Sequence, residues 1–111
     1  MRKLVGALII SLSVPGLALA SSWDNVSLVD AHCVSKVKAD PDKHPTSCLL
    51  QCANGGYGIM TGGTWVKLDE AGNKLALAAL KGTHRKDHIR VNVSGEQKGD
   101  VIQVSSLKIA D

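Results

Sequence analysis

The sequence contains no phenylalanine, and Trp23, Tyr57 and Trp65 are its only Trp or Tyr residues. The hydrophobic core must therefore be built mainly from Val, Ile, Leu and Ala, without the large apolar area that aromatic rings bury. A single domain of this length buries only a modest core. The shortage of aromatic residues predicts that a covalent or metal cross-link adds to the stability of the fold.

The chain also lacks a large excess of charge of one sign. Of its 13 Lys and Arg residues, two lie within residues 1–20, so the remaining 11 face 10 Asp and Glu and the net charge falls from +3 to +1. Nucleic-acid-binding domains usually carry a strongly basic surface, so we expect no nucleic-acid partner. The basic run KGTHRKDHIR, residues 81–90, is predicted to be a solvated loop that enters a strand.

No apolar run reaches the ~20 residues that a membrane-spanning helix needs. Residues 1–20 begin with two positive charges, continue with an apolar run to Leu12 and end in Ala-Leu-Ala, where signal peptidase reads small residues. They are predicted to be a signal peptide that is cleaved after Ala20. The expected product, residues 21–111, is one periplasmic or secreted domain without a membrane span.

Alternating apolar and polar residues predict five short strands. The first lies in WDNVSLVDAHCV and ends near Cys33, and YGIMT and TWVKLD form a hairpin around Gly62-Gly63. A second hairpin has its turn within residues 95–100, and a phase shift in its last strand predicts a bulge near Ser105-Ser106.

Two short helices are predicted between these strands. One is opened by Pro45 and runs through CLLQCA to the Asn54-Gly55-Gly56 stop. The other covers residues 73–81 and ends at Gly82; EAGN before it is interpreted as a turn, and a β interpretation of this short run stays open. The order predicts a mainly β fold, an OB-like barrel of five strands with one or two short helices.

Three pairs of residues and a closing hairpin resemble a pattern found in a group of small exported bacterial OB-like proteins of unknown function. In that pattern a strand ends in Asp-x-x-Cys, a later segment carries Cys-x-x-x-Cys followed by Gly-Gly, and the chain closes with a Val-x-Val-x-Gly hairpin. The matching residues are Asp30 with Cys33, Cys48 with Cys52, Gly55 with Gly56, and Val91, Val93 and Gly95. The resemblance implies the fold and the compartment, and the activity has to be argued from the site.

The cysteines Cys33, Cys48 and Cys52 are the candidates for a disulfide. In an oxidising compartment, three cysteines allow one bond and leave one thiol. Cys48 and Cys52 lie four residues apart on a predicted helix, near the upper end of the distance that a disulfide can bridge. Cys33 to Cys48 and Cys33 to Cys52 are therefore the two favoured pairings, and either would add roughly 3 kcal/mol of stability.

The same region offers an alternative metal site made of Cys33, His44, Cys48 and Cys52. Three thiolates and an imidazole suit Zn(II), and a subset of the thiolates suits Cu(I). The Cys-x-x-x-Cys spacing differs from the usual zinc knuckle, and Pro45 disfavours a helical backbone at His44.

The leading functional hypothesis is a monomeric, non-catalytic binding or structural module that needs no cofactor and is stabilised by a disulfide. A zinc- or copper-binding envelope protein is the first alternative. A thiol redox protein is the second, although such proteins usually carry Cys-x-x-Cys at a helix N-terminus.

Overall fold

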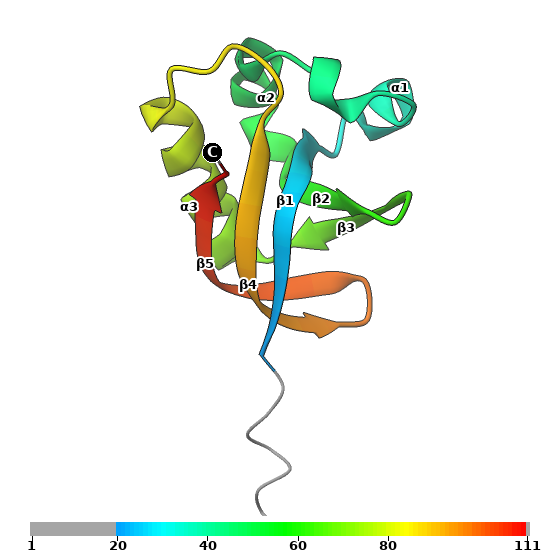
Figure 1. Cartoon of the computed structure of the whole chain (residues 1–111), viewed down its shortest axis with the longest axis vertical. Coiled ribbons are helices and arrows are strands. Elements are labelled where there is room, and N and C mark those ends of the chain that lie inside the picture. Colours follow the sequence, from blue (N-terminus) through cyan, green and yellow to red (C-terminus); the bar gives the residue numbers. More distant parts are fainter. Residues whose placement is uncertain (1–19, 111) are drawn as a thin grey trace, which may run out of the picture.

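The computed structural model describes residues 20–110, so the predicted signal peptide lies outside it except for Ala20. This part of the chain folds into five β-strands in one sheet with three α-helices (Figure 1), and the prediction of a mainly β fold with five strands is confirmed. The elements are β1 (Ser21–Asp30), α1 (Val34–Val37), α2 (Thr46–Gln51), β2 (Tyr57–Thr61), β3 (Thr64–Leu68), α3 (Glu70–Gly82), β4 (Arg90–Lys98) and β5 (Val101–Ile109), with 3-10 turns at Pro41–Lys43 and Ala53–Gly55.

The strands pair in the order β1-β2-β3-β5-β4, and β4 returns to β1, so that the sheet closes into a barrel. All pairs are antiparallel except β3 with β5, which meet in parallel where Lys67 faces Val101 and Leu68 faces Ile102. Both predicted hairpins, β2–β3 and β4–β5, are present (Figure 1).

The predicted bulge in the last strand is confirmed. Ser94 pairs with Ser106 and Gly95 pairs with Val104, so Ser105 has no partner in the ladder. A Cβ atom on Gly95 would lie only 2.2 Å from the backbone oxygen of Gln103. Glycine is therefore required where the two backbones approach each other at the bend.

Three secondary-structure predictions need correction. The strand β1 ends at Asp30 and not near Cys33, and it is followed by the short helix α1, which was not predicted. The structure therefore has three helices where one or two were expected. The interpretation of residues 70–73 as a turn is wrong, because α3 begins at Glu70. Asp69 caps this helix by accepting a hydrogen bond from the Gly72 N–H at 2.9 Å, and the same oxygen accepts one from the Val104 N–H at 3.2 Å.

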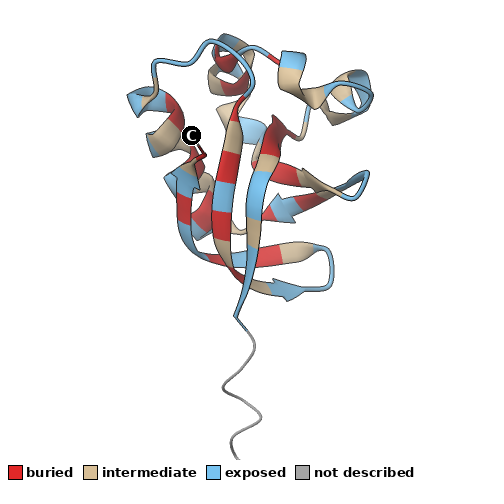
Figure 2. Ribbon diagram, in the orientation of Figure 1, coloured by how far each residue is buried: buried red, intermediate tan, exposed pale blue. Residues whose placement is uncertain are grey.

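The buried residues lie on the strands and on the helices that face them (Figure 2), and the core is aliphatic, as predicted, with one fully buried aromatic residue. Tyr57 is 1% exposed, and its hydroxyl donates to the Leu49 carbonyl oxygen at 2.8 Å. Helix α3 packs against β5 through buried residues at spacings of four, Gly72, Ala76 and Leu80. The apolar residues buried with Tyr57 are Leu28, Leu49, Ile59, Val66, Leu68, Ala76, Leu80, Ile89, Val91, Val93, Ile102, Val104 and Leu107.

Gly72 allows α3 to pack closely on the barrel, and its replacement by alanine is expected to destabilise the protein by about 1–3 kcal/mol. Alanine normally stabilises a helix relative to glycine. Here, however, the new Cβ would lie 2.5 Å from Val104 Cγ2 and 2.8 Å from Leu68 Cβ. Gly82→Ala is the matched control, because a Cβ there meets nothing within 4 Å. Urea unfolding of both variants tests the packing, and equal stabilities would contradict it.

The segment between β1 and β2, residues 31–56, lies at one end of the barrel and is called the cap here (Figure 1). Its buried side chains are those of His44, Thr46 and Leu49, and α1 has no buried residue. Within the described residues, no helix is long and apolar enough to cross a membrane.

Candidate functional site: a buried Asp30–His44 pair beside two thiols

Asp30, the last residue of β1, is a fully buried carboxylate at the base of the cap. Its Oδ1 accepts a hydrogen bond from His44 Nε2 at 2.6 Å, and its Oδ2 accepts one from the Cys33 backbone N–H at 3.1 Å. His44 is itself only 4% exposed. Because an unpaired buried carboxylate is very costly, these two donors are what permit an aspartate at this position.

The pairing of β1 with β2 brings the two ends of the cap together. Asp30 lies opposite Tyr57, and the Ala31 N–H donates to the Gly56 carbonyl oxygen at 3.0 Å, which extends the ladder into the cap. Cys33 comes two residues after Ala31, on the part of the cap that continues from β1. Cys52 follows the end of α2, where its N–H donates to the Cys48 carbonyl oxygen at 3.1 Å.

The result is a cluster of three side chains that we call the Asp-Cys-Cys cluster: Asp30, Cys33 and Cys52. A carboxylate oxygen and the two Sγ atoms all lie within 4.8 Å of one another, and both cysteines are half-buried. Over residues 20–110, no other group of three or more His, Cys, Asp or Glu side chains is gathered in this way.

Of the residues predicted for a metal site, Cys33 and Cys52 are brought together. His44 is not a member of the cluster, but it is linked to it by its hydrogen bond to Asp30. Cys48 lies on α2, is half-buried and is not a member of the cluster. Of the two pairings that the sequence left open, the structure thus brings the sulfur atoms of Cys33 and Cys52 close to each other.

Burial raises the pKa of the Cys52 thiol, and the nearby Asp30 carboxylate and Cys33 thiol raise it further. A raised pKa leaves less thiolate at neutral pH, and the thiolate is the nucleophile. Attacking thiols of redox enzymes have the opposite shift. The environment of Cys52 therefore speaks against a role as an attacking thiol.

Burial and the neighbouring Asp30 and Cys52 also raise the pKa of Tyr57 to about 12. The folded state thus favours the neutral phenol over the phenolate. The stability that this preference adds is fully present below pH ~10, and it is lost as the pH rises toward 12. Tyr57 is the only tyrosine, so phenolate absorbance reports on it alone. We expect the phenolate to form near pH 12, together with loss of the native far-UV circular dichroism. A midpoint near pH 10 in a protein that is still folded would contradict this environment.

A second polar cluster holds the middle of the cap against the barrel. Asp42 accepts hydrogen bonds from Arg90 Nη2 at 2.8 Å and from Ser27 Oγ at 2.7 Å. The Arg90 guanidinium lowers the pKa of the Asp42 carboxyl. The Asp42 carbonyl oxygen also accepts from the His88 N–H at 2.8 Å. These bonds fix the segment that carries His44 two residues later.

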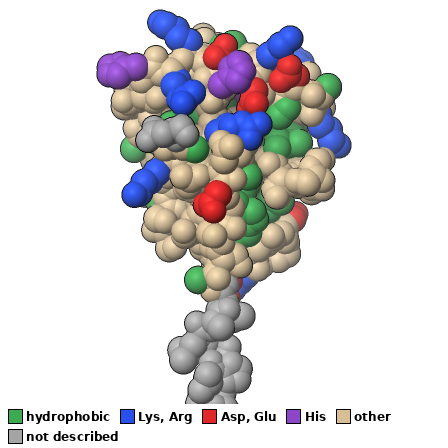
Figure 3. Space-filling view, viewed as in Figure 1, with side chains coloured by type: hydrophobic (Ala, Val, Ile, Leu, Met, Phe, Trp, Pro, Cys, Tyr) green, Lys and Arg blue, Asp and Glu red, His purple; other side chains and the backbone are tan. Residues whose placement is uncertain are grey.

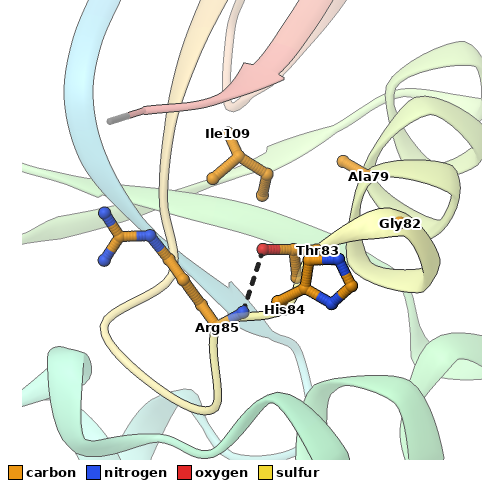
Figure 4. A pocket seen from close by; sticks show the side chains of 6 residues that line it. All are labelled: Ala79, Gly82, Thr83, His84, Arg85 and Ile109. Carbon is orange, nitrogen blue, oxygen red and sulfur yellow. Dashed lines mark hydrogen bonds between the residues drawn. The ribbon is translucent and has the colours of Figure 1, made fainter.

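The basic run predicted as a loop, residues 81–90, is a loop in its middle part: residues 83–88 are mostly exposed and lead toward β4, whereas Lys81 and Gly82 end α3 and Ile89 is buried. Lys, Arg and His side chains lie with Asp and Glu at the cap end of the molecule (Figure 3), so this face shows no patch of a single sign. One groove lies between the loop and the C-terminal end of α3, where the Arg85 N–H donates to Thr83 Oγ1 at 3.2 Å (Figure 4). Its lining residues, Ala79, Gly82, Thr83, His84, Arg85 and Ile109, do not include the Asp-Cys-Cys cluster.

Another groove lies where β2 and β3 meet the start of α3, and Tyr57, Trp65, Lys67 and Asn73 are among its lining residues. Two of the three aromatic residues are therefore found here. Their polar atoms hold the fold, since Trp65 Nε1 donates to the Val29 carbonyl oxygen at 3.1 Å and the Tyr57 hydroxyl donates to Leu49.

In the sequence, Asp30 was noted only as part of the Asp-x-x-Cys motif, and Tyr57 was not predicted to lie beside the site. The sequence signal that could have identified Asp30 was an acidic residue directly after Leu28-Val29, at the end of a strand and three residues before a cysteine.

Comparison of the chain with protein-family models, curated proteins and solved structures finds no match. The function therefore has to be argued from the chemistry of the site and from the fold.

Proposed function

We propose that this chain is a small exported, non-catalytic OB-like module whose cap is fastened to the barrel by a disulfide between Cys33 and Cys52. The observation that carries the proposal is the position of these two thiols, which lie within 4.8 Å of each other where the ends of the cap meet. The groove beside Trp65 and Lys67 is the surface that we assign to ligand binding in such a module.

Two features support the OB-like assignment. The strand order β1-β2-β3-β5-β4 closes back on β1, and a helix, α3, stands between β3 and β4. Small Greek-key barrels of this kind combine five strands with variable loops that bind ligands. The predicted signal peptide supports the exported location, where disulfides form and persist.

Burial alone gives the cap little stability, because three of its side chains are buried and the rest are exposed or half-buried. A disulfide would add to the free energy that holds the cap on the barrel. Exchange with a small-molecule disulfide would convert the two thiols to one disulfide and reduce the oxidant to two thiols, which balances atoms and electrons. The new bond closes a loop of about 20 residues and is expected to add about 3 kcal/mol to the free energy of unfolding.

Exposure of the full-length chain to glutathione disulfide tests the proposal. We expect a mass lower by two hydrogens, a peptide that links Cys33 to Cys52, and alkylation of Cys48 alone. Cys48→Ser is the matched control and should keep the bond, whereas Cys33→Ser and Cys52→Ser should lose it. Urea unfolding with and without reductant should differ by about 3 kcal/mol.

A Cys33–Cys48 link, or three thiols that all remain open to alkylation, would contradict the disulfide. The export part is tested separately by the N-terminus of protein recovered from the envelope or the medium. That protein should begin at Ser21.

A further inference from the structure

We propose that the reduced protein binds one divalent cation of the zinc type through the Asp30 carboxylate and the Cys33 and Cys52 thiolates. The geometry of the Asp-Cys-Cys cluster carries this inference, because three metal-binding donors from two different segments converge within 4.8 Å. The inference does not depend on the proposed disulfide, since it concerns the form in which both thiols are reduced.

The separations suit a tetrahedral ion. With Zn–S near 2.3 Å and Zn–O of about 2.0–2.2 Å, tetrahedral angles place neighbouring donors about 3.5–3.8 Å apart. The donors of the cluster therefore need to move by only about 1 Å or less, which adjustments of the cysteine side chains can supply. The two thiols are half-buried rather than sealed, so an ion can reach them from solvent.

The donor types select among metals. Two thiolates and a carboxylate suit Zn(II) and similar borderline cations, whereas Cu(I) favours purely soft thiolate or thioether sets, and Ca²⁺ and Mg²⁺ favour oxygen alone. Three protein donors leave the fourth tetrahedral position to water.

The surroundings of Asp30 already resemble the support that ligands receive from neighbouring residues in metal sites. His44 Nε2 donates to Oδ1 and the Cys33 N–H donates to Oδ2, which orients the carboxylate before any ion arrives. Each carboxylate oxygen keeps a free lone pair for a metal. His44 therefore acts as a positioning residue for the carboxylate and is not itself a ligand.

Binding balances both charge and protons. The two thiols release two protons as the dication binds two thiolate sulfurs. The site then keeps the single negative charge of the carboxylate, which the hydrogen bonds from the imidazole N–H and the backbone N–H stabilise. The same two sulfurs cannot bind a metal and form a disulfide at once. Oxidation to the Cys33–Cys52 disulfide must therefore release the ion.

Titration of the reduced full-length chain with Co(II) tests the proposal. In Cys48→Ser we expect thiolate-to-cobalt charge-transfer absorbance that saturates at one cobalt per chain and is displaced by Zn(II). Cys33→Ser and Cys52→Ser should lose this saturating signal. Asp30→Asn should weaken zinc affinity by at least about 10- to 100-fold, the loss that removal of even an outer-shell partner causes.

Circular dichroism of each variant shows whether it is folded, and the two cysteine variants decide the question if Asp30→Asn does not fold. Absence of the thiolate signal in folded, reduced Cys48→Ser would overturn the proposal, and so would a signal that requires Cys48. Zinc binding is measured on reduced protein and the disulfide on oxidised protein, so failure of one leaves the test of the other intact.

Discussion

Asp30→Ala is expected to lower the free energy of unfolding by roughly 2–6 kcal/mol, because two donors lose the acceptor that they share, at about 1–3 kcal/mol each. The carboxylate is fully buried and accepts hydrogen bonds from His44 Nε2 and from the Cys33 N–H. Without it, the imidazole N–H remains buried and loses the acceptor with which it makes a 2.6 Å bond. Urea unfolding of the reduced protein measures the loss.

Asp24→Ala is the matched control, because Asp24 also lies on β1 but is exposed. Its replacement should change stability by no more than about 0.5 kcal/mol. A double-mutant cycle with His44→Ala then isolates the pair. We expect the double variant to be less destabilised than the sum of the two single variants, since it leaves no unpaired buried group. Additive losses would show that Asp30 and His44 do not act as a pair.

Leu49→Ala is expected to cost about 2–5 kcal/mol of stability, the range for truncating a fully buried leucine. Leu49 is 0% exposed and is the buried apolar anchor of α2, whose other buried residue is Thr46. The loss should weaken the contact between the cap and the core. Thermal and urea unfolding, monitored by tryptophan fluorescence and by far-UV circular dichroism, measure the effect.

The control is Leu75→Ala, a leucine on α3 that is 37% exposed. It removes the same atoms from a helix and should cost much less, because those atoms already contact water. If both variants lose similar stability, then α2 is not held by the burial of Leu49. The Tyr57 hydroxyl bond to the Leu49 backbone oxygen should survive the change, since no backbone atom is removed.

Local periodicity predicted most of the sheet. Alternating residues in β4 and β5, and the Gly62-Gly63 turn between β2 and β3, identified both hairpins, because strand faces and tight turns are encoded by neighbouring residues. The phase shift near Ser105 predicted the bulge for the same reason.

The start of α3 was missed because its cap is partly tertiary. Asp69 accepts one bond from Gly72 within the helix and another from the Val104 N–H of β5, so the residue is positioned by a strand 35 positions away. Helix α1 was missed because it has four residues and no buried face, and so leaves no apolar period to detect.

What the sequence determined by itself is the aliphatic core and the five strands. These follow from composition and short-range pattern. Only the tertiary structure decided which thiols meet and that Asp30 and His44 pair beside them. That choice depends on the register of β1 against β2 and on the path of the cap, which bring residues 30, 33, 44 and 52 together. Such contacts are non-local, and no sequence period reports them.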